Sequence, residues 1–153
     1  MISVTIITIR DDLQRLVDEI NQASWDDANE MSRYDVEALS AYLERQDTLF
    51  IACHGIGESD RVLMGIASSR FEFKPYDKER WIYVDEVDVC ADQRQKGAGK
   101  AMMRKLIEIA NDSGCEEVWL GTEVDNQAAN ALYQSVEPDD VAQVIGYTYE
   151  TDD

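Results

Sequence analysis

The chain has 153 residues and a formal charge of -18 at pH 7, with 32 acidic side chains against 14 lysines and arginines. Hydrophobic residues make up 44% of it, which is typical of a globular protein with its own core rather than of a disordered chain. The negative charge disfavours nucleic acid and anionic membrane surfaces as partners, and it favours cationic ones. An acidic surface with few lysines is also typical of adaptation to salt, so the net charge alone identifies no ligand.

Cysteine and histidine usage argues against metal chemistry. Cys53, Cys90 and Cys115 are widely spaced with no CxxC pair, and His54 is the single histidine. We therefore expect neither a disulfide framework nor a metal site. No stretch approaches the roughly 18 apolar residues of a membrane span, and the first residues lack the features of a signal peptide. We expect a cytoplasmic protein that does not interact with membranes.

The N-terminal half predicts a strand, two helices and then an antiparallel meander. Strand signals are β-branched, alternating runs bounded by turn residues, and Asp11 or Asp12 is placed to cap the first helix. That helix carries Leu13, Leu16 and Ile20 on one face. The expected strands cover residues 2–9, 48–53, 62–73 and 81–89, and the second helix runs from about 34 to 45.

The C-terminal half predicts a helix, a short strand, a second helix and a last strand. The expected helices cover 98–110 and 126–134, and the expected strands cover 116–121 and 141–151. Met103, Leu106, Ile107 and Ala110 form the core-facing stripe of the first of these helices. Because there is no repeat, linker or low-complexity tract, we expect residues 1–153 to form one domain. Its class is α/β (α+β), with a mixed, mostly antiparallel central sheet of about six to seven strands flanked by about four helices.

The most informative segment is the run Arg94-Gln95-Lys96-Gly97-Ala98-Gly99, between the strand at 81–89 and the helix at 98–110. Two glycines at such a junction allow a tight turn and a close approach of backbone N–H groups to a ligand. The positive end of the following helix suits an anion. Cations gather in this acidic chain at Arg94, Lys96, Lys100, Arg104 and Lys105. The turn therefore predicts a pyrophosphate site.

The turn and a second motif together resemble a known family. Arg94-x-x-Gly97-x-Gly99 after a strand, followed by a helix, a strand and Asn126-x-x-Ala129-x-x-Leu132-Tyr133, resembles the GNAT superfamily of acetyl-coenzyme A-dependent N-acetyltransferases. The order of elements agrees with a GNAT-like sheet over nearly the whole chain.

The resemblance implies a role for each matching position. The main chain of Val87 and Val89 would pair with the pantetheine arm of the coenzyme. Arg94 and the amides of Gln95, Lys96, Gly97, Ala98, Gly99 and Lys100 would hold its pyrophosphate, and Asn126 would lie near its thiol end. Tyr133 would be the acid that protonates the departing thiolate. A phenol at the sulfur is chemically suited to that step, because a thiol of pKa about 8.5 leaves with little help.

The reaction also needs a base, because an ammonium has no lone pair with which to attack a thioester. Asp85, Glu86 and Asp88 place three acids within four positions of the strand at 81–89, which is unfavourable in a central strand unless they line a wet site. Strict alternation puts Glu86 and Asp88 on one face and Asp85 on the other, and a bulge would change this facing. Glu86 is the preferred base and Asp88 the second candidate.

These acids indicate a cationic acceptor. The Val84–Val89 strand and the acidic pair Glu123 and Asp125 resemble the aminoglycoside 3-N-acetyltransferase branch, in which these acids and Asp85 would contact the amine substrate. The segment after Tyr133 departs from the family pattern, and Asp139 and Asp140 there are further candidate contacts. A polyamine, a protein or a peptide acceptor remains an alternative, and so does a non-catalytic module that binds acyl-CoA. We also expect a homodimer, with Tyr147 and Tyr149 of the last strand at its interface.

Overall fold

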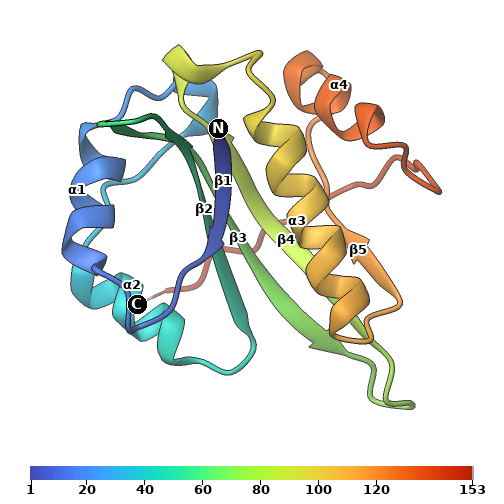
Figure 1. The fold of residues 1–153 in the computed structure, drawn as a ribbon. Coiled ribbons are helices and arrows are strands. Elements are labelled where there is room, and N and C mark those ends of the chain that lie inside the picture. The colour runs from blue at the N-terminus through green and yellow to red at the C-terminus, as the bar shows by residue number, and fades with distance from the viewer. Residues whose placement is uncertain (153) are drawn as a thin grey trace.

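The computed structural model describes residues 1–152. Its central sheet has five strands in the order β1-β2-β3-β4-β5, all antiparallel except the parallel pair β4–β5. The helices α1 and α2 cover one face of the sheet, and α3 covers the other beside α4 (Figure 1). In chain order the elements are β1 (Ile2–Ile6), α1 (Leu13–Gln22), the 3₁₀ turn η1 (Asp27–Asn29), α2 (Val36–Glu44), β2 (Thr48–Ile56), β3 (Arg61–Phe73), β4 (Arg80–Val89), the 3₁₀ turn η2 (Ala91–Gln93), α3 (Ala98–Asp112), β5 (Glu117–Trp119) and α4 (Gln127–Ser135).

The predicted fold class is confirmed, but the predicted number of strands is wrong. The described residues form four α-helices and a mixed, mostly antiparallel sheet of five strands rather than six or seven. The missing strand is the one expected at 141–151, where the described residues have no regular secondary structure. A strand is stable only when a neighbour satisfies its N–H and C=O groups. No strand of the described sheet pairs with this segment.

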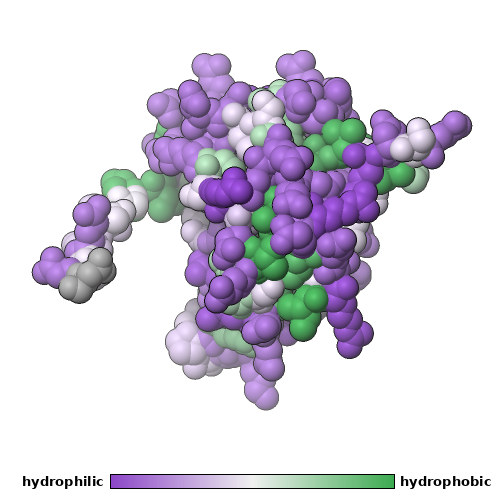
Figure 2. Space-filling model, turned by 90° about the vertical axis from the view of Figure 1, so that its left-hand side faces the viewer, coloured by the Kyte–Doolittle hydropathy of each residue, from purple (hydrophilic) through white to green (hydrophobic). Residues whose placement is uncertain are grey.

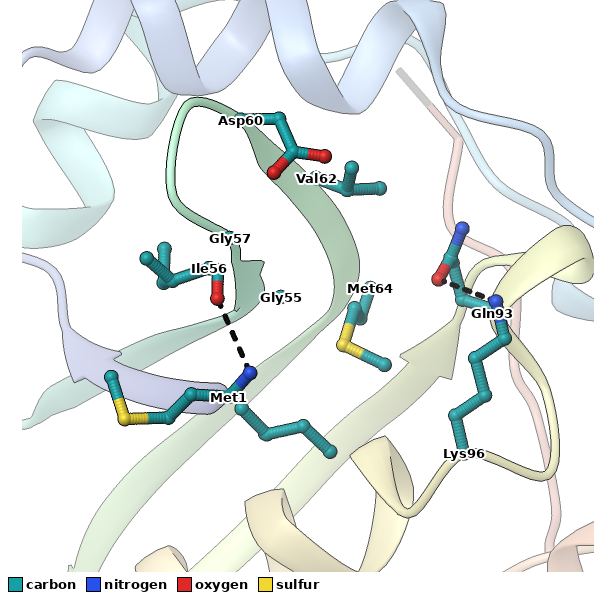
Figure 3. A pocket seen from close by; sticks show the side chains of 10 residues that line it. Met1, Gly55, Ile56, Gly57, Asp60, Val62, Met64, Gln93 and Lys96 are labelled. Carbon is teal, nitrogen blue, oxygen red and sulfur yellow. Dashed lines mark hydrogen bonds between the residues drawn. The ribbon is translucent and has the colours of Figure 1, made fainter.

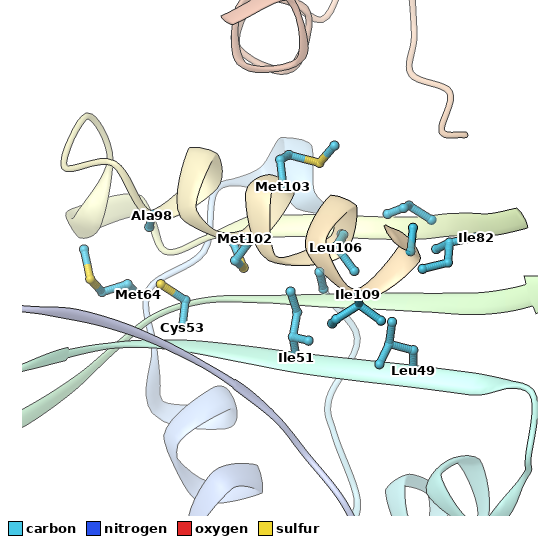
Figure 4. Close-up of a cluster of buried hydrophobic side chains, with 13 residues drawn as sticks. Leu49, Ile51, Cys53, Met64, Ile82, Ala98, Met102, Met103, Leu106 and Ile109 are labelled. Carbon is cyan, nitrogen blue, oxygen red and sulfur yellow. The ribbon is translucent and has the colours of Figure 1, made fainter. Parts of the chain in front are cut away.

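The core on the α3 face joins that helix to the middle of the sheet. Met102 and Leu106 are completely buried there, and α3 lies along strand residues such as Ile51 and Ile82 (Figure 4). The predicted stripe of α3 is partly wrong, since Ile107 is 37% exposed. The buried face is centred on Met102, Leu106 and Ile109, which follow each other at helical spacing.

The second core lies between the sheet and the helices α1 and α2. Leu16, Val17 and Ile20 of α1 are buried against Phe50 and Ile66 of the sheet. Of the two predicted caps, Asp12 is the one that caps α1, because its carboxylate accepts the N–H of Arg15 at 3.1 Å. The two cores hold β4 between helices on both faces of the sheet.

A β-bulge in β4 decides how its acidic side chains are oriented. Ser68 of β3 faces Glu86, whereas the next residue, Ser69, faces Val84, so Asp85 is the extra residue of β4. A bulge turns two consecutive side chains towards the same face. Asp85 and Glu86 accordingly line one pocket on the α2 face. The expectation from strict alternation, that Asp85 points to the opposite face, is therefore wrong.

The C-terminal segment 141–152 extends away from the body of the molecule (Figure 2). It carries large apolar side chains that are exposed by 68% to 85%, namely Val141, Val144, Ile145, Tyr147 and Tyr149. A contiguous set of exposed apolar residues on a soluble surface marks a site of interaction more often than chance exposure. Within residues 1–152, no helix combines the length and the apolarity that crossing a bilayer requires.

Candidate active site

The sheet opens between β4 and β5, beside the second half of β4. Strand β5 pairs with β4 only at Trp81, Ile82 and Tyr83, whereas β4 continues to Val89. The other edge of β4 is occupied by β3, up to the pair of Gly65 with Val89. The main chain around Val87 and Val89 thus has an edge that no described strand pairs with. An open strand edge is a template for an extended ligand that carries amide groups.

The turn after β4 presents free amides at the start of α3. Gln95 and Gly97 have left-handed backbone conformations, with φ of 61° and 93°. Gly97 is the N-cap of the 15-residue helix α3, and it offers no side-chain oxygen to the first N–H groups of the helix. These groups remain available to a bound anion. The geometry of the turn therefore suits a pyrophosphate.

The two glycines of the turn serve different purposes. Gly97 has a backbone conformation that residues with a side chain rarely adopt. Gly99 is buried, and a Cβ added there would lie 2.8 Å from Cδ2 of Leu132 in α4. Gly99 thus allows α3 and α4 to approach closely, which places the helix that carries Tyr133 beside the turn.

The exposed cations of the turn have contacts within the protein. Arg94 forms an ion pair with Asp26, which lies just before η1. Lys96 donates to Oε1 of Gln93 at 3.3 Å. Gln93 and Lys96 border a hollow of about 360 Å³ near Met1, on the β1 side of the turn (Figure 3). Lys100 is exposed at the first turn of α3.

A pocket of about 390 Å³ lies on the face of β4 that α2 covers, under the connection between α1 and α2. This volume lies within the range of about 300–1,000 Å³ that small-molecule sites occupy. Its walls combine aromatic rings with charged groups, three of them carboxylates and one a guanidinium. The lining residues are Ser32, Arg33, Tyr34, Asp35, Ala38, Leu39, Tyr42, Phe50, Ser68, Asp85 and Glu86.

Among the carboxylates of this pocket, two are already engaged. Asp85 is ion-paired with Arg70 at 3.2 Å, and Asp35 caps α2 by accepting the N–H of Ala38 at 3.1 Å. Within residues 1–152, no lysine, arginine or histidine lies at ion-pair distance from Glu86. Glu86 is therefore the acid of the pocket that is free to receive a cation or a proton.

The environment makes Glu86 a stronger base than an ordinary glutamate. Partial burial, the charge of Asp88 and a hydrogen bond to it raise the pKa of Glu86 above its usual value. Asp88 is buried, and burial raises its pKa too, although bonds from Asn29 and Glu86 act in the opposite direction. A base whose pKa moves towards the operating pH transfers protons more effectively.

Tyr133 lies on α4, partly buried against the core on the α3 face. Burial and the charge of Asp88 raise the pKa of Tyr133 to about 12, so its phenol stays protonated at neutral pH. Asn126 forms the N-cap of the same helix, and its side chain accepts the N–H of Ala129 at 3.0 Å. Tyr133 thus lies within electrostatic reach of β4.

The structure brings only some of the predicted acceptor contacts together. Asp85 and Glu86 share the pocket, and Asp88 is next to Glu86 on the same strand. Glu123, Asp125, Asp139 and Asp140 are exposed and do not line it. They follow β5 or α4 in the chain, on the other side of the open edge of β4 from the pocket.

Sequence reasoning missed the residues that come from the helical side of the pocket. Tyr34 and Tyr42 line it, and their rings pack against Phe50 with centroids 6.1 and 6.3 Å away. Asn29 donates to Asp88 at 2.9 Å across 59 positions of sequence. Tyr34 and Tyr42, at either end of α2, are the local signal for this wall, because the contacts themselves are made only in the folded chain.

The open edge of β4, the helix N-terminus beside it and the acidic pocket across the strand lie around one strand of a mixed α/β fold. The chain belongs to the acetyltransferase (GNAT) family, which it matches over residues 12–136. The resemblance to this family seen in the sequence is thereby confirmed.

Curated relatives match a part of the chain. Human N-acetyltransferase 8 is 29% identical over 85 residues, which cover 56% of this chain and 37% of that protein. Bovine thialysine N-epsilon-acetyltransferase is 30% identical over 70 residues, which cover 46% of this chain and 41% of that protein. The aligned segments thus span less than half the length of these relatives.

Solved structures match nearly the whole chain. An aminoglycoside acetyltransferase from an uncultured soil metagenomic sample, in complex with sisomicin, superposes with a TM-score of 0.83 and 18% identity, covering 99% of this chain and 97% of that one. Ribosomal-protein-alanine N-acetyltransferase from Brucella melitensis biovar Abortus 2308 superposes with a TM-score of 0.73 and 16% identity, covering 99% of both. At these identities the likeness shows the fold alone.

Proposed function

We propose that this protein is an acetyl-CoA-dependent N-acetyltransferase whose acceptor is a cationic small molecule, most consistent with an aminoglycoside acetylated at a 3-amino group. The observation that supports this most directly is the acidic pocket of about 390 Å³, in which Glu86 has no cationic partner among the described residues. The pocket and the open edge lie along the same stretch of β4. An amine and a thioester bound there would meet across one strand.

The residues at the open edge fit the coenzyme. Val87 and Val89 would pair with its pantetheine arm, and the amides from Gln95 to Lys100 would hold its pyrophosphate with help from Arg94. Asn126 would lie near its thiol end. When bound, the coenzyme supplies an activated acetyl group. The left-handed Gly97 and the uncapped start of α3 are the local features that support this assignment.

Glu86 would prepare the amine. The carboxylate accepts a proton from the bound ammonium and leaves a lone pair on nitrogen. The new C–N bond would then replace the C–S bond of the thioester, and the sulfur would leave as a thiolate that takes up a proton. The raised pKa of Glu86 favours this transfer near neutral pH. Asp88 is the second candidate, but it is only 6% exposed and already accepts from Asn29. Asp85 would contact the acceptor while paired with Arg70.

Tyr133 would act as the acid. Its phenol is protonated at neutral pH, as an unperturbed tyrosine of pKa about 10 would also be, and the thiol end of the coenzyme is where that proton would be needed. A side chain that donates in this step must be protonated beforehand, and Tyr133 satisfies that requirement.

The test is a thiol-release assay with acetyl-CoA and a panel of amines. The panel contains aminoglycosides with and without a 3-amino group, spermidine-like polyamines, and lysine and N-terminal peptides. Thiol release confined to aminoglycosides with a 3-amino group supports the proposal. Thiol release with polyamines or peptides instead would show that the acceptor belongs to one of those classes. Binding of acetyl-CoA without release for any amine supports the non-catalytic acyl-CoA module. The volume of the pocket, about 390 Å³, is within the range of small-molecule sites.

A homodimer built on the C-terminal segment is part of the proposal. Tyr147 and Tyr149 are 77% and 85% exposed, and the segment around them has strand-like composition but no partner strand in the described sheet. β5 offers a free edge on the side away from β4. The same segment of a second copy would satisfy both needs through β-augmentation.

A further inference from the structure

Three contacts connect the turn after β4 with Asp88 through the connection between α1 and α2. Asn29 donates from Nδ2 to Oδ1 of Asp88 at 2.9 Å, and its own Oδ1 accepts the N–H of Asp26 at 3.0 Å. The carboxylate of Asp26 forms the ion pair with Arg94. A backbone bond of 2.7 Å from Ala91 to the carbonyl of Ser24 joins the same two segments.

This geometry fixes the amide of Asn29 at both ends. Its oxygen is held by the backbone before η1, so its nitrogen has one direction in which to donate, and Asp88 lies there. A carboxylate that is 6% exposed needs such a donor to remain charged, because burial alone favours the neutral acid. Hydrogen bonds to a charged group are also the stronger ones.

We propose that Asn29 is a positioning residue that keeps Asp88 ionised and oriented beside the reaction centre. Through the Asp26–Arg94 ion pair, this effect of Asn29 depends on whether the coenzyme is bound at the turn after β4. The proposal rests on the proposed function for the identity of the two sites. An anion bound at the turn competes with Asp26 for Arg94. Loss of that pair loosens the anchor of Asn29 and makes Asp88 more basic when the coenzyme is present.

Other titratable groups lie near Asp88 and influence its protonation. Glu86 lies next to it on β4, Tyr34 faces it from the connection before α2, Tyr133 faces it from α4, and Cys90 follows it in the chain. None of these is a cation that could replace Asn29 as the stabilising partner. The hydrogen bond from Asn29 is the main interaction that lowers the pKa of Asp88 against the effect of burial.

The first test measures Asp88 directly, by carbon-13 NMR titration of its carboxyl group in the coenzyme-free protein. Asn29→Ala should raise the midpoint by about one pH unit, because the donor to the charged form is lost. Asn29→Asp keeps the shape and the bond to the Asp26 N–H, so the fold is retained, and the apparent midpoint of the pair should rise further.

Asn21→Ala is the matched structural control. Asn21 also anchors this connection, by bonds of 2.9 and 2.8 Å with the backbone of Tyr34, but it has no bond to Asp88. It should move the midpoint by less than about 0.3 unit. Equal midpoints in the parent and both Asn29 variants overturn the positioning role, and so does an equal shift in Asn21→Ala.

The second test addresses the connection to the coenzyme turn. Addition of coenzyme A should raise the Asp88 midpoint in the parent. Asp26→Asn should raise it in the free protein and reduce the change that coenzyme A causes by at least about half. Asp27→Asn removes the same charge from an exposed neighbour and should behave like the parent. An undiminished response in Asp26→Asn overturns the coupling.

The outcome is separable from that of the proposed function, because the titrations require no turnover. If no amine is acetylated but the midpoints shift as expected, the proposed function fails and the positioning stands. Where turnover is measured, Asn29→Ala should move the acidic limb of the pH profile of kcat/KM for the amine to higher pH. The KM for acetyl-CoA should change less than twofold.

Discussion

Gly65→Ala tests how tightly β3 and β4 are held together at the reaction centre. Gly65 lies opposite Val89, and a Cβ added there would be 2.6 Å from the backbone oxygen of Asp88 and 2.7 Å from Cε of Met102. The methionine end can rotate away, but the backbone oxygen moves only with its strand. To reach the 3.4 Å at which ordinary contact begins, β4 must retreat by about 0.8 Å.

Such overpacking costs about 1–3 kcal/mol of unfolding free energy. For a chain of this size, each kcal/mol lowers the melting temperature by about 2–4 °C, so we expect a decrease of about 2–12 °C. The displacement also moves Asp88 and the open edge at Val89, so acetyl transfer should fall together with the melting temperature.

Gly146→Ala is the matched control, because no atom lies within 4 Å of the added Cβ. Its unfolding free energy should remain within about 0.5 kcal/mol of the parent. Thermal unfolding followed by circular dichroism measures both variants. A Gly65→Ala protein with the same melting temperature as the parent would refute the close approach of β3 to the Asp88 backbone.

Three further changes probe the proposed chemistry and assembly. Glu86→Gln should lower the rate of acetyl transfer at pH 7 by about 10²-fold, and this rate should recover partly at alkaline pH, where the amine loses its proton unaided. In the parent, activity should be lost as the pH falls through the pKa of Glu86, which is raised above 4.5. Tyr133→Phe should lower kcat by about 10²-fold or more and leave the KM for acetyl-CoA nearly unchanged, as steady-state kinetics would show. Replacing both Tyr147 and Tyr149 by Asp should convert the expected dimer to a monomer in light scattering, with an unaltered melting profile; a monomeric parent would exclude the dimer.

Local patterns in the sequence predicted the elements whose signals are local. The structure has the cap of α1 at Asp12, one of two candidates, together with the strands β2 to β4, the glycine turn and the helix expected near 126–134, each of which depends on a few neighbouring residues. The resemblance to the family added the order of elements. What was predicted well is therefore the frame that supports the coenzyme turn.

Features that depend on distant contacts were not predictable in this way. The bulge at Asp85 arises from the pairing of β4 with Ser68 and Ser69 of β3, and composition does not reveal which residue is the extra one. The strand expected at 141–151 has strand composition, but a strand also needs a neighbour. Asn29 reaches Asp88 across 59 positions, and no spacing rule covers such a pair.

The proposed base and the proposed acid lie on the two sides of β4, and both have raised pKa values. Glu86 and Tyr133 are both shifted upwards, and the charge of Asp88 contributes to both shifts. The result for Glu86 is a carboxylate that takes up a proton more readily. The result for Tyr133 is a phenol that stays protonated at neutral pH and gives up its proton less readily than an ordinary tyrosine. The charge of a single buried aspartate, which accepts a hydrogen bond from Asn29, thus contributes to the raised pKa of one group on each side of β4.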